Sequence, residues 1–190
     1  MEVVADHLQE VSAVVECPEV DAFVDALLST KRVFVMGAGR SGLVARAFAM
    51  RLMHVGLMVY VVGEMVTPAL ETGDLVVAIS GSGNTHTIAD FGEVAKGKGA
   101  RLVTVTNNSD SRLGRISDIV VTLKPRKGSR PGDRGYERRP DADEDAKQLT
   151  PLGTLFEITS MVFLDGIIAR IMALRDLDEE ELRRRHTVLE

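Results

Sequence analysis

Several kinds of residue and segment are scarce in this sequence, and each scarcity excludes a class of protein. The 190 residues include no tryptophan, two tyrosines and one cysteine, Cys17, so no disulfide can form within the chain. No apolar run approaches the roughly 18 residues that a membrane-spanning helix needs. The first residues include Glu2, Asp6 and Glu10, which is unlike the basic start of a signal peptide. We therefore expect a soluble, cytoplasmic protein with no membrane partner.

An excess of positive charge is missing as well. Lysine and arginine total 23 against 28 aspartates and glutamates, which gives a net charge of -5. This balance gives no electrostatic reason to expect a nucleic-acid partner. Hydrophobic residues make up 45% of the chain and aromatic residues 4%, so aliphatic side chains and methionine must fill the core. The length fits one compact α/β domain, which we expect to span residues 1–190.

Strand and helix patterns alternate along the middle of the chain. Leu75–Ile79 is apolar without alternation, as is typical of a parallel strand buried on both faces. The five expected strands are Val33–Met36, Met58–Val62, Leu75–Ile79, Leu102–Thr106 and Ile119–Leu123. The helices expected between them are Leu43–Val55, Thr85–Lys98 and Ser109–Ile116. This order predicts a doubly wound, five-stranded parallel sheet flanked by helices in three α/β/α layers.

Further segments lie on both sides of this region. Two helices, Val3–Cys17 and Val20–Thr30, are expected before the sheet. The segment 124–147 is rich in glycine, proline and charge, and we expect a mobile surface loop or, alternatively, a lid over a phosphate site. Leu155–Leu174 is apolar around most of its circumference, which indicates a helix buried on several sides, with contact between subunits as one way to cover it. A short charged helix, Asp178–His186, is expected last.

The first glycine-rich loop has the pattern of a dinucleotide-binding turn. The run RVFVMGAGRSG at 32–42 ends in GxGxxG, whose middle glycine is Gly39, and a helical pattern follows. Glu64, at the end of the next strand, lies roughly where a ribose-binding acid would be. Taken alone, this pattern favours NAD. Ser41 favours a different ligand, because it places a hydroxyl group at the start of a helix.

A second loop follows the strand Leu75–Ile79. It consists of Ser80, Gly81, Ser82, Gly83, Asn84 and Thr85. Its glycines permit close backbone approach, and the free N–H groups and dipole of the next helix favour an anion. It contains no lysine or arginine, so it is not a Walker loop, and its hydroxyl groups suit a phosphate monoester without metal. Helix capping is the alternative for one such loop, but two loops on neighbouring strands favour phosphate binding.

These segments resemble the SIS (sugar isomerase) domain family, and within it the 6-phospho-3-hexuloisomerases. The matching pieces run in order through nearly the whole chain: GAGRSGLVARAFAMRLMHVG at 37–56, VYVVGE at 59–64, LVVAISGSGNT at 75–85, PLGTLFE at 151–157 and RRH at 184–186. The resemblance implies an isomerase without cofactor, usually a homotetramer, of the ribulose monophosphate pathway. Its reaction converts D-arabino-3-hexulose 6-phosphate into D-fructose 6-phosphate. The segment 124–147 is longer than the family suggests, and Val188 stands where an asparagine is expected.

The resemblance also implies roles for individual residues. Ser41 and the loop 80–85 are expected to hold the phosphorylated hexulose, and Glu157 is expected to be the catalytic base. His54 is expected to shuttle protons between O2 and O3 or to open the furanose ring. The further expected contacts are His186, Gly39 and Thr67.

An ordinary structural interpretation exists for each of these ionisable residues. Moving a carbonyl from C3 to C2 through an enediol needs one carboxylate that takes a proton from C2 and returns it to C3. Glu157 could do this, or it could be a first-turn carboxylate in a capping box with Thr154. His54 could instead be a C-terminal histidine favoured by the helix dipole. His186 could reach the site of a neighbouring copy or lie on a solvated terminal helix.

Three classes of function follow from these patterns. The leading hypothesis is the 6-phospho-3-hexuloisomerase, with an isomerase of another phosphosugar as its nearest alternative. The second class is a non-catalytic, phosphosugar-binding SIS module. The third class is a Rossmann dehydrogenase, which NAD binding would reveal. The spacing of histidines and carboxylates matches no metal site, so we expect no metal. The absence of a cofactor is what the family resemblance implies.

Overall fold

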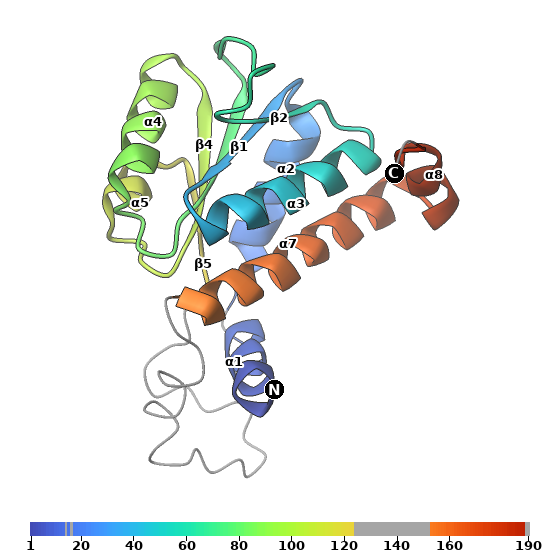
Figure 1. The fold of residues 1–190 in the computed structure, drawn as a ribbon, viewed down its shortest axis with the longest axis horizontal. Helices are drawn as coiled ribbons and strands as arrows, with labels where there is room; N and C mark the ends of the chain where they lie inside the picture. The colour runs from blue at the N-terminus through green and yellow to red at the C-terminus, as the bar shows by residue number, and fades with distance from the viewer. Residues whose placement is uncertain (14, 16, 124–152, 189–190) are drawn as a thin grey trace.

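A parallel sheet with helices on both faces forms the centre of the molecule (Figure 1). The computed structural model describes residues 1–13, 15, 17–123 and 153–188. The strands are β1 (Val33–Gly37), β2 (Val59–Val61), β3 (Leu75–Ile79), β4 (Arg101–Thr106) and β5 (Ile119–Thr122). The helices are α1 (Glu2–Ser12), α2 (Cys17–Ser29), α3 (Arg40–His54), α4 (His86–Gly97), α5 (Arg112–Ile116), α7 (Thr154–Arg175) and α8 (Glu179–Arg184).

The order of the strands confirms the predicted fold class. All neighbouring strands are parallel, in the order β2-β1-β3-β4-β5. The direction of winding reverses between β1 and β3, because β2 lies on one side of β1 and the later strands lie on the other. In open sheets of this kind, ligands bind outside the carboxyl ends of the strands at such a switch point. We therefore expect a ligand to bind at the carboxyl ends of β1 and β3.

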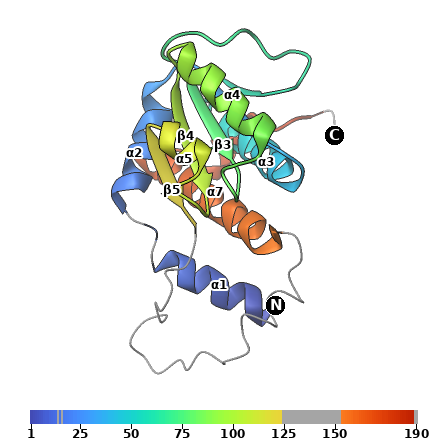
Figure 2. The same cartoon turned by 90° about the vertical axis from the view of Figure 1, so that its left-hand side faces the viewer.

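Alternate side chains of the central strands enter two separate hydrophobic cores. Val33 and Val35 of β1 belong to the core shared with α2, α3 and α7. Phe34 and Met36 of the same strand belong to the core shared with α4 and α5. The helices of the two cores lie on opposite faces of the sheet (Figure 2). Because both faces are covered, all five residues of β3 are buried and apolar without alternation, as predicted.

The helices α3 and α7 lie side by side and run in the same direction (Figure 1). At their beginnings, Arg40 of α3 contacts Glu157 in the first turn of α7. At their ends, the Arg175 Nη1 donates a hydrogen bond of 3.5 Å to the Val55 carbonyl oxygen. Both helices therefore begin at the carboxyl edge of the sheet and end at the opposite edge.

The first helices differ in their bounds from the expected ones. α1 ends at Ser12 rather than Cys17, and Pro18 lies in the first turn of α2, where its missing N–H removes no helical hydrogen bond. The segment 124–147, predicted to be a loop, lies outside the described residues. Within the ranges that the structure describes, no helix is both long enough and apolar enough to cross a membrane.

Candidate functional site

Two loops lie next to each other at the switch point of the sheet. We call residues 37–42 the GAGRSG loop and residues 80–85 the serine loop. β1 and β3 are paired as far as their last residues, with Gly37 opposite Ile79. Each loop leads directly from its strand into a helix, α3 or α4. The structure thus brings together the two loops that the sequence singled out.

The GAGRSG loop turns sharply from β1 into α3. Gly39 has a φ of 57° and directly precedes Arg40, the first residue of the helix. At Gly37 strand and helix approach closely, since a Cβ there would lie 2.7 Å from the Ser41 carbonyl oxygen. α3 consequently begins at Arg40 rather than at Leu43, and the half-buried Ser41 lies in its first turn. The Gly42 N–H donates to the Gly39 carbonyl oxygen at 3.0 Å, so the N–H groups of Arg40 and Ser41 are the ones at this helix start that could bind an anion.

The serine loop is held in place by the segment that follows β4. Gly83 has a φ of 64°, and a Cβ there would lie 1.9 Å from the Ser111 Oγ, so a side chain does not fit. The Gly81 carbonyl oxygen accepts hydrogen bonds from the Asn107 N–H at 3.0 Å and from the Thr106 hydroxyl at 3.2 Å. The backbone of the loop is therefore fixed by contacts within the protein.

Three hydroxyl groups gather on the serine loop, those of Ser80, Ser82 and Thr85. Ser80 is 3% exposed, and its Oγ lies 3.4 Å from the Thr85 Oγ1. Ser82 is exposed, and its Oγ accepts a hydrogen bond of 3.2 Å from the Asn84 N–H. α4 begins at His86, so the N–H groups of its first turn follow directly. This combination of neutral donors and a helix dipole can bind a phosphate group.

Two expected substrate contacts have partners within the protein. The Asn84 Oδ1 accepts a hydrogen bond of 2.9 Å from the Arg112 N–H, which joins the serine loop to α5. The Thr67 hydroxyl donates a hydrogen bond of 2.6 Å to the Val61 carbonyl oxygen in the turn after β2. Both side chains thus have a structural role that the sequence did not reveal.

Glu157 joins the two loops from the first turn of α7. Phe156 packs against the serine loop, because a Cβ at Gly81 would lie 3.0 Å from its ring. Glu157 itself is 9% exposed, and its Oε2 accepts a hydrogen bond from the Arg40 Nε in the GAGRSG loop. A nearly buried carboxylate beside a candidate anion site is a candidate for proton transfer to or from a bound molecule.

Sequence reasoning missed two polar residues of this site. Arg40 stands within the motif, but no local pattern reveals that it meets Glu157, 117 positions further on. Asn107 follows β4, and its Oδ1 is buried with no hydrogen-bond partner among the described residues. A buried acceptor of this kind beside the serine loop is available to a sugar hydroxyl. Its position at the carboxyl end of a parallel strand is the signal that could have identified it.

His54 and His186 lie at the far end of α3 from Arg40. The 15 residues of α3 separate its two ends by about 20 Å. The two imidazole rings stack with their centroids 5.1 Å apart. Burial, together with the neighbouring His186 and Arg51, lowers the pKa of His54 below its ordinary value. The structure therefore does not bring either histidine to the Glu157 of the same chain.

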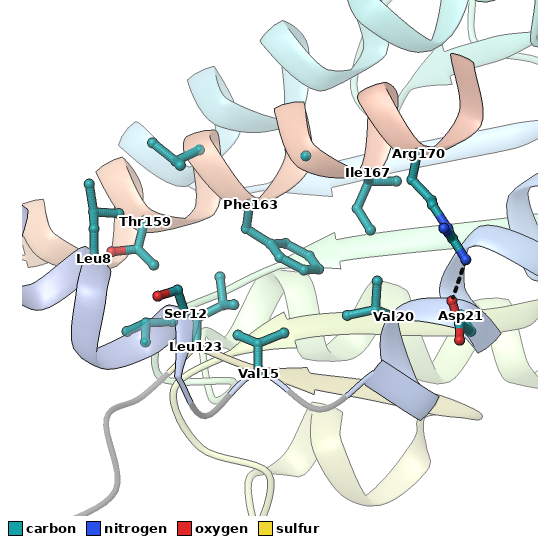
Figure 3. Close-up of a pocket in the computed structure, with 13 residues that line it drawn as sticks. Leu8, Ser12, Val15, Val20, Asp21, Leu123, Thr159, Phe163, Ile167 and Arg170 are labelled. Carbon is teal, nitrogen blue, oxygen red and sulfur yellow. Dashed lines mark ion pairs between the residues drawn. The ribbon is translucent and has the colours of Figure 1, made fainter. Parts of the chain in front are cut away.

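Other parts of the molecule were candidates for a cofactor, a metal or a ligand. Glu64, the expected acid of the dinucleotide interpretation, forms an ion pair of 2.6 Å with Arg46 of α3. Among the described residues, no three histidine, cysteine or carboxylate side chains are grouped so that they could hold a metal ion. A cavity of about 490 Å³ lies between α1, α2 and α7 (Figure 3). Its lining is mainly apolar, for example Val11, Phe163 and Ile167, and includes none of the candidate site residues.

Known proteins are similar to this chain over its whole length. The SIS domain family model matches residues 26–132, which is more than half of the chain. A 3-hexulose-6-phosphate isomerase of Bacillus subtilis is 36% identical over 192 residues, covering 100% of this chain and 98% of that protein. An uncharacterized protein of Archaeoglobus fulgidus is 44% identical over 190 residues, with 100% and 98% covered.

Solved structures are similar in both sequence and shape, and one of them has an inferred function. It is the crystal structure of a Methanococcus jannaschii protein, for which a molecular function of 3-hexulose-6-phosphate isomerase was inferred. Its TM-score is 0.82 at 30% identity, and the match covers 100% of this chain and 98% of that chain. The family model matches both loops, and the relatives match over the full length of the chain. The chain therefore belongs to the SIS domain family.

Proposed function

We propose that this chain is a 6-phospho-3-hexuloisomerase, which converts D-arabino-3-hexulose 6-phosphate into D-fructose 6-phosphate. The position of Glu157 carries the proposal: a carboxylate that is 9% exposed lies where the serine loop, the GAGRSG loop and α7 meet. Relatives of the same length that are named for this reaction support the same assignment. The broader assignment, a phosphosugar isomerase, rests on the same features.

In the proposed complex, the serine loop binds the phosphate group. The hydroxyl groups of Ser80, Ser82 and Thr85 donate to it, together with the first N–H groups of α4. Ser41 and the backbone at Gly39 form the opposite wall. The buried Asn107 Oδ1, which has no partner among the described residues, accepts a hydrogen bond from a sugar hydroxyl.

The reaction moves one proton between neighbouring carbons. The Glu157 carboxylate removes the proton from C2, and the electrons of that bond form the C2–C3 double bond while negative charge passes to O3. The O2 proton moves to O3, and the protonated Glu157 then gives its proton to C3, which leaves the carbonyl at C2. A single carboxylate can perform both transfers, because C2 and C3 are adjacent. Glu157 is regenerated as a carboxylate.

The histidines would act from a neighbouring copy of the chain. His54 and His186 lie about 20 Å of helix away from the beginning of α3, so they cannot reach the Glu157 of the same chain. A copy whose α3 end approached the carboxyl edge would supply both rings to the site. They would carry the O2 proton to O3, or open the ring of fructose 6-phosphate in the reverse direction. The 3-hexulose phosphate itself forms no stable ring, because O1 and O5 would close only four-membered rings.

Hydrogen exchange in D2O tests the proposal. The wild-type protein should exchange the C3 hydrogen of fructose 6-phosphate for deuterium, because the 2,3-enediol forms by its removal, and should retain the C1 hydrogens. Glu157→Gln should slow this exchange roughly 1,000-fold, since the general base is lost. Calorimetry should find that fructose 6-phosphate still binds to the variant.

The outcomes separate the competing functions. Exchange at C1 would indicate an aldose–ketose isomerase of another phosphosugar. Binding without any exchange would indicate a non-catalytic, phosphosugar-binding module. Glu179→Gln is the matched control, because Glu179 is also a first-turn carboxylate paired with an arginine, 3.0 Å from Arg183, but lies exposed on α8. Its exchange rate should equal that of the wild type.

A further inference from the structure

Arg40 is the cation that contacts the candidate base. We propose, on the basis of the function proposed above, that the Arg40 guanidinium binds the two oxygens of the enediolate, O2 and O3. It stabilises their negative charge while Glu157 carries the proton. Arg40 is then a catalytic residue that touches the reacting atoms, in addition to being a partner of Glu157.

An arginine at position 40 adds little to the stability of the folded protein. Its side chain is 59% exposed, whereas that of Glu157 is 11% exposed. Solvent around so exposed a cation screens its charge and weakens what the ion pair contributes to folding. Arg40 is also the first residue of α3, where the helix dipole disfavours a cation. A function in the site explains this placement better than a structural role does.

The movement of charge during the reaction requires a cation that reaches beyond Glu157. A cation bound to the carboxylate alone would stabilise the state before proton transfer and would slow the reaction. When Glu157 becomes protonated, its negative charge disappears and an equal charge arises on O3. A guanidinium that reaches both atoms keeps an anionic partner throughout, because the charge moves from one to the other within its reach.

The shape of the guanidinium suits this double contact. Within the described ranges, the hydrogen bonding of Arg40 is to Glu157 through Nε, which leaves the donors of the two Nη atoms for a ligand. A cis-enediolate presents two neighbouring oxygens in one plane, much as a carboxylate does. Planar pairs of N–H donors bind such an oxygen pair bidentately, whereas a lysine offers one compact charge.

The test measures binding in a background where Glu157 carries no charge. In Glu157→Gln, arginine can no longer act by orienting a carboxylate. The probe is a phosphorylated aldonohydroxamate, whose two oxygens imitate the cis-enediolate. Adding Arg40→Lys should weaken hydroxamate binding by about tenfold or more, since an enediolate mimic loses its bidentate contact. Inorganic phosphate binding, measured by calorimetry, should change by less than about twofold, because the serine loop is intact.

A kinetic measurement and a matched control complete the test. In the otherwise wild-type chain, Arg40→Lys should lower kcat roughly 100- to 1,000-fold with little change in KM. Arg115→Lys is the control, because Arg115 also forms an ion pair through Nε, 2.9 Å from Asp110, and is 68% exposed on α5. Its kcat should equal that of the wild type. In Arg40→Ala, added guanidinium should restore part of the turnover.

The results that would contradict this role of Arg40 differ from the results that would contradict the proposed function. Unchanged hydroxamate affinity on Arg40→Lys in the Glu157→Gln background would overturn the inference, and equal losses for hydroxamate and phosphate would identify Arg40 as a phosphate ligand instead. If the wild-type protein turned over substrate and Arg40→Lys kept its kcat, the isomerase would stand without this role. If the wild-type protein showed no turnover, the proposed function itself would fail, and this inference with it.

Discussion

At the scale of single residues, Asp74 ties the loop before β3 to the beginning of the sheet. It is 5% exposed and accepts hydrogen bonds from the Arg32 Nε at 2.9 Å and Nη2 at 2.6 Å, and from the Glu71 N–H at 2.7 Å. Burial opposes ionisation of the Asp74 carboxyl, but the bonds from Arg32 and Glu71 outweigh it, so its pKa lies below the ordinary value. The charged form of Asp74 therefore stabilises the folded state.

Replacing this carboxylate should cost stability in a way that depends on pH. We expect Asp74→Asn to lower the free energy of unfolding by about 2 kcal/mol near neutral pH. Because its folded pKa is lowered, the contribution of Asp74 is complete above the ordinary value of 3.8 and is lost as the pH falls through the folded value. Urea unfolding of both proteins over this pH range measures the difference. Glu71→Gln, whose side chain is 75% exposed, should change stability little.

His54 should make the protein less stable in mild acid. Burial lowers its pKa, with smaller effects from His186 and Arg51, so the unfolded chain takes up a proton at a higher pH than the folded chain does. Its contribution is therefore complete above the ordinary value of 6.5 and is lost as the pH falls toward the folded value. His54→Gln should have a shallower dependence of unfolding free energy on pH below 6.5. An unchanged slope would show that His54 is not the titrating group.

At the scale of elements, the sequence predicts the strands and the loops more completely than it predicts the contacts between helices that are distant in the chain. The continuous apolar run Leu75–Ile79 predicts a strand covered on both faces, because every side chain of such a strand is buried and none faces water. The GAGRSG motif predicts a turn but not its helix start at Arg40, which depends on the close approach at Gly37. The pairing of Arg40 with Glu157 depends on α3 packing against α7, which no local pattern contains.

The geometry of the serine loop should depend on Gly83. A side chain there would meet the Ser111 Oγ, so Gly83→Ala should displace the loop and weaken phosphate binding by about tenfold or more. Gly73→Ala is the control, because Gly73 also has a positive φ, 87°, but a Cβ there would meet no atom within 4 Å. Both variants should lose stability through backbone strain, measured by thermal unfolding. Equal phosphate affinity in the two would contradict the role of the loop.

At the scale of the whole molecule, the two ends of α3 hold different parts of the expected site. Arg40 and Glu157 lie at the carboxyl edge of the sheet, and the stacked pair of His54 and His186 lies at the opposite edge. All of these residues except Arg40 were predicted from the sequence as candidates. The sequence alone does not show that they lie at different ends of one helix. We therefore expect a complete site to form between copies of the chain.

Mixing two inactive variants tests this expectation. If a site takes Glu157 from one copy and His54 from another, a mixed dimer of Glu157→Gln and His54→Gln has one complete site and one doubly altered site. Random reassembly after mild unfolding should therefore restore about a quarter of wild-type activity. The restored activity is measured as the rate of fructose 6-phosphate formation before and after mixing. If both residues belonged to the site of one copy, the mixture would stay inactive.

The most direct measurement is turnover of the proposed substrate by the wild-type chain and by Glu157→Gln. D-arabino-3-hexulose 6-phosphate would first be generated from ribulose 5-phosphate and formaldehyde by a separate enzyme, which is then removed by filtration. The account predicts that the wild-type protein forms fructose 6-phosphate and that Glu157→Gln binds the sugar phosphate but forms product roughly 1,000-fold more slowly. Equal rates for the two proteins, or no product from either, would contradict it.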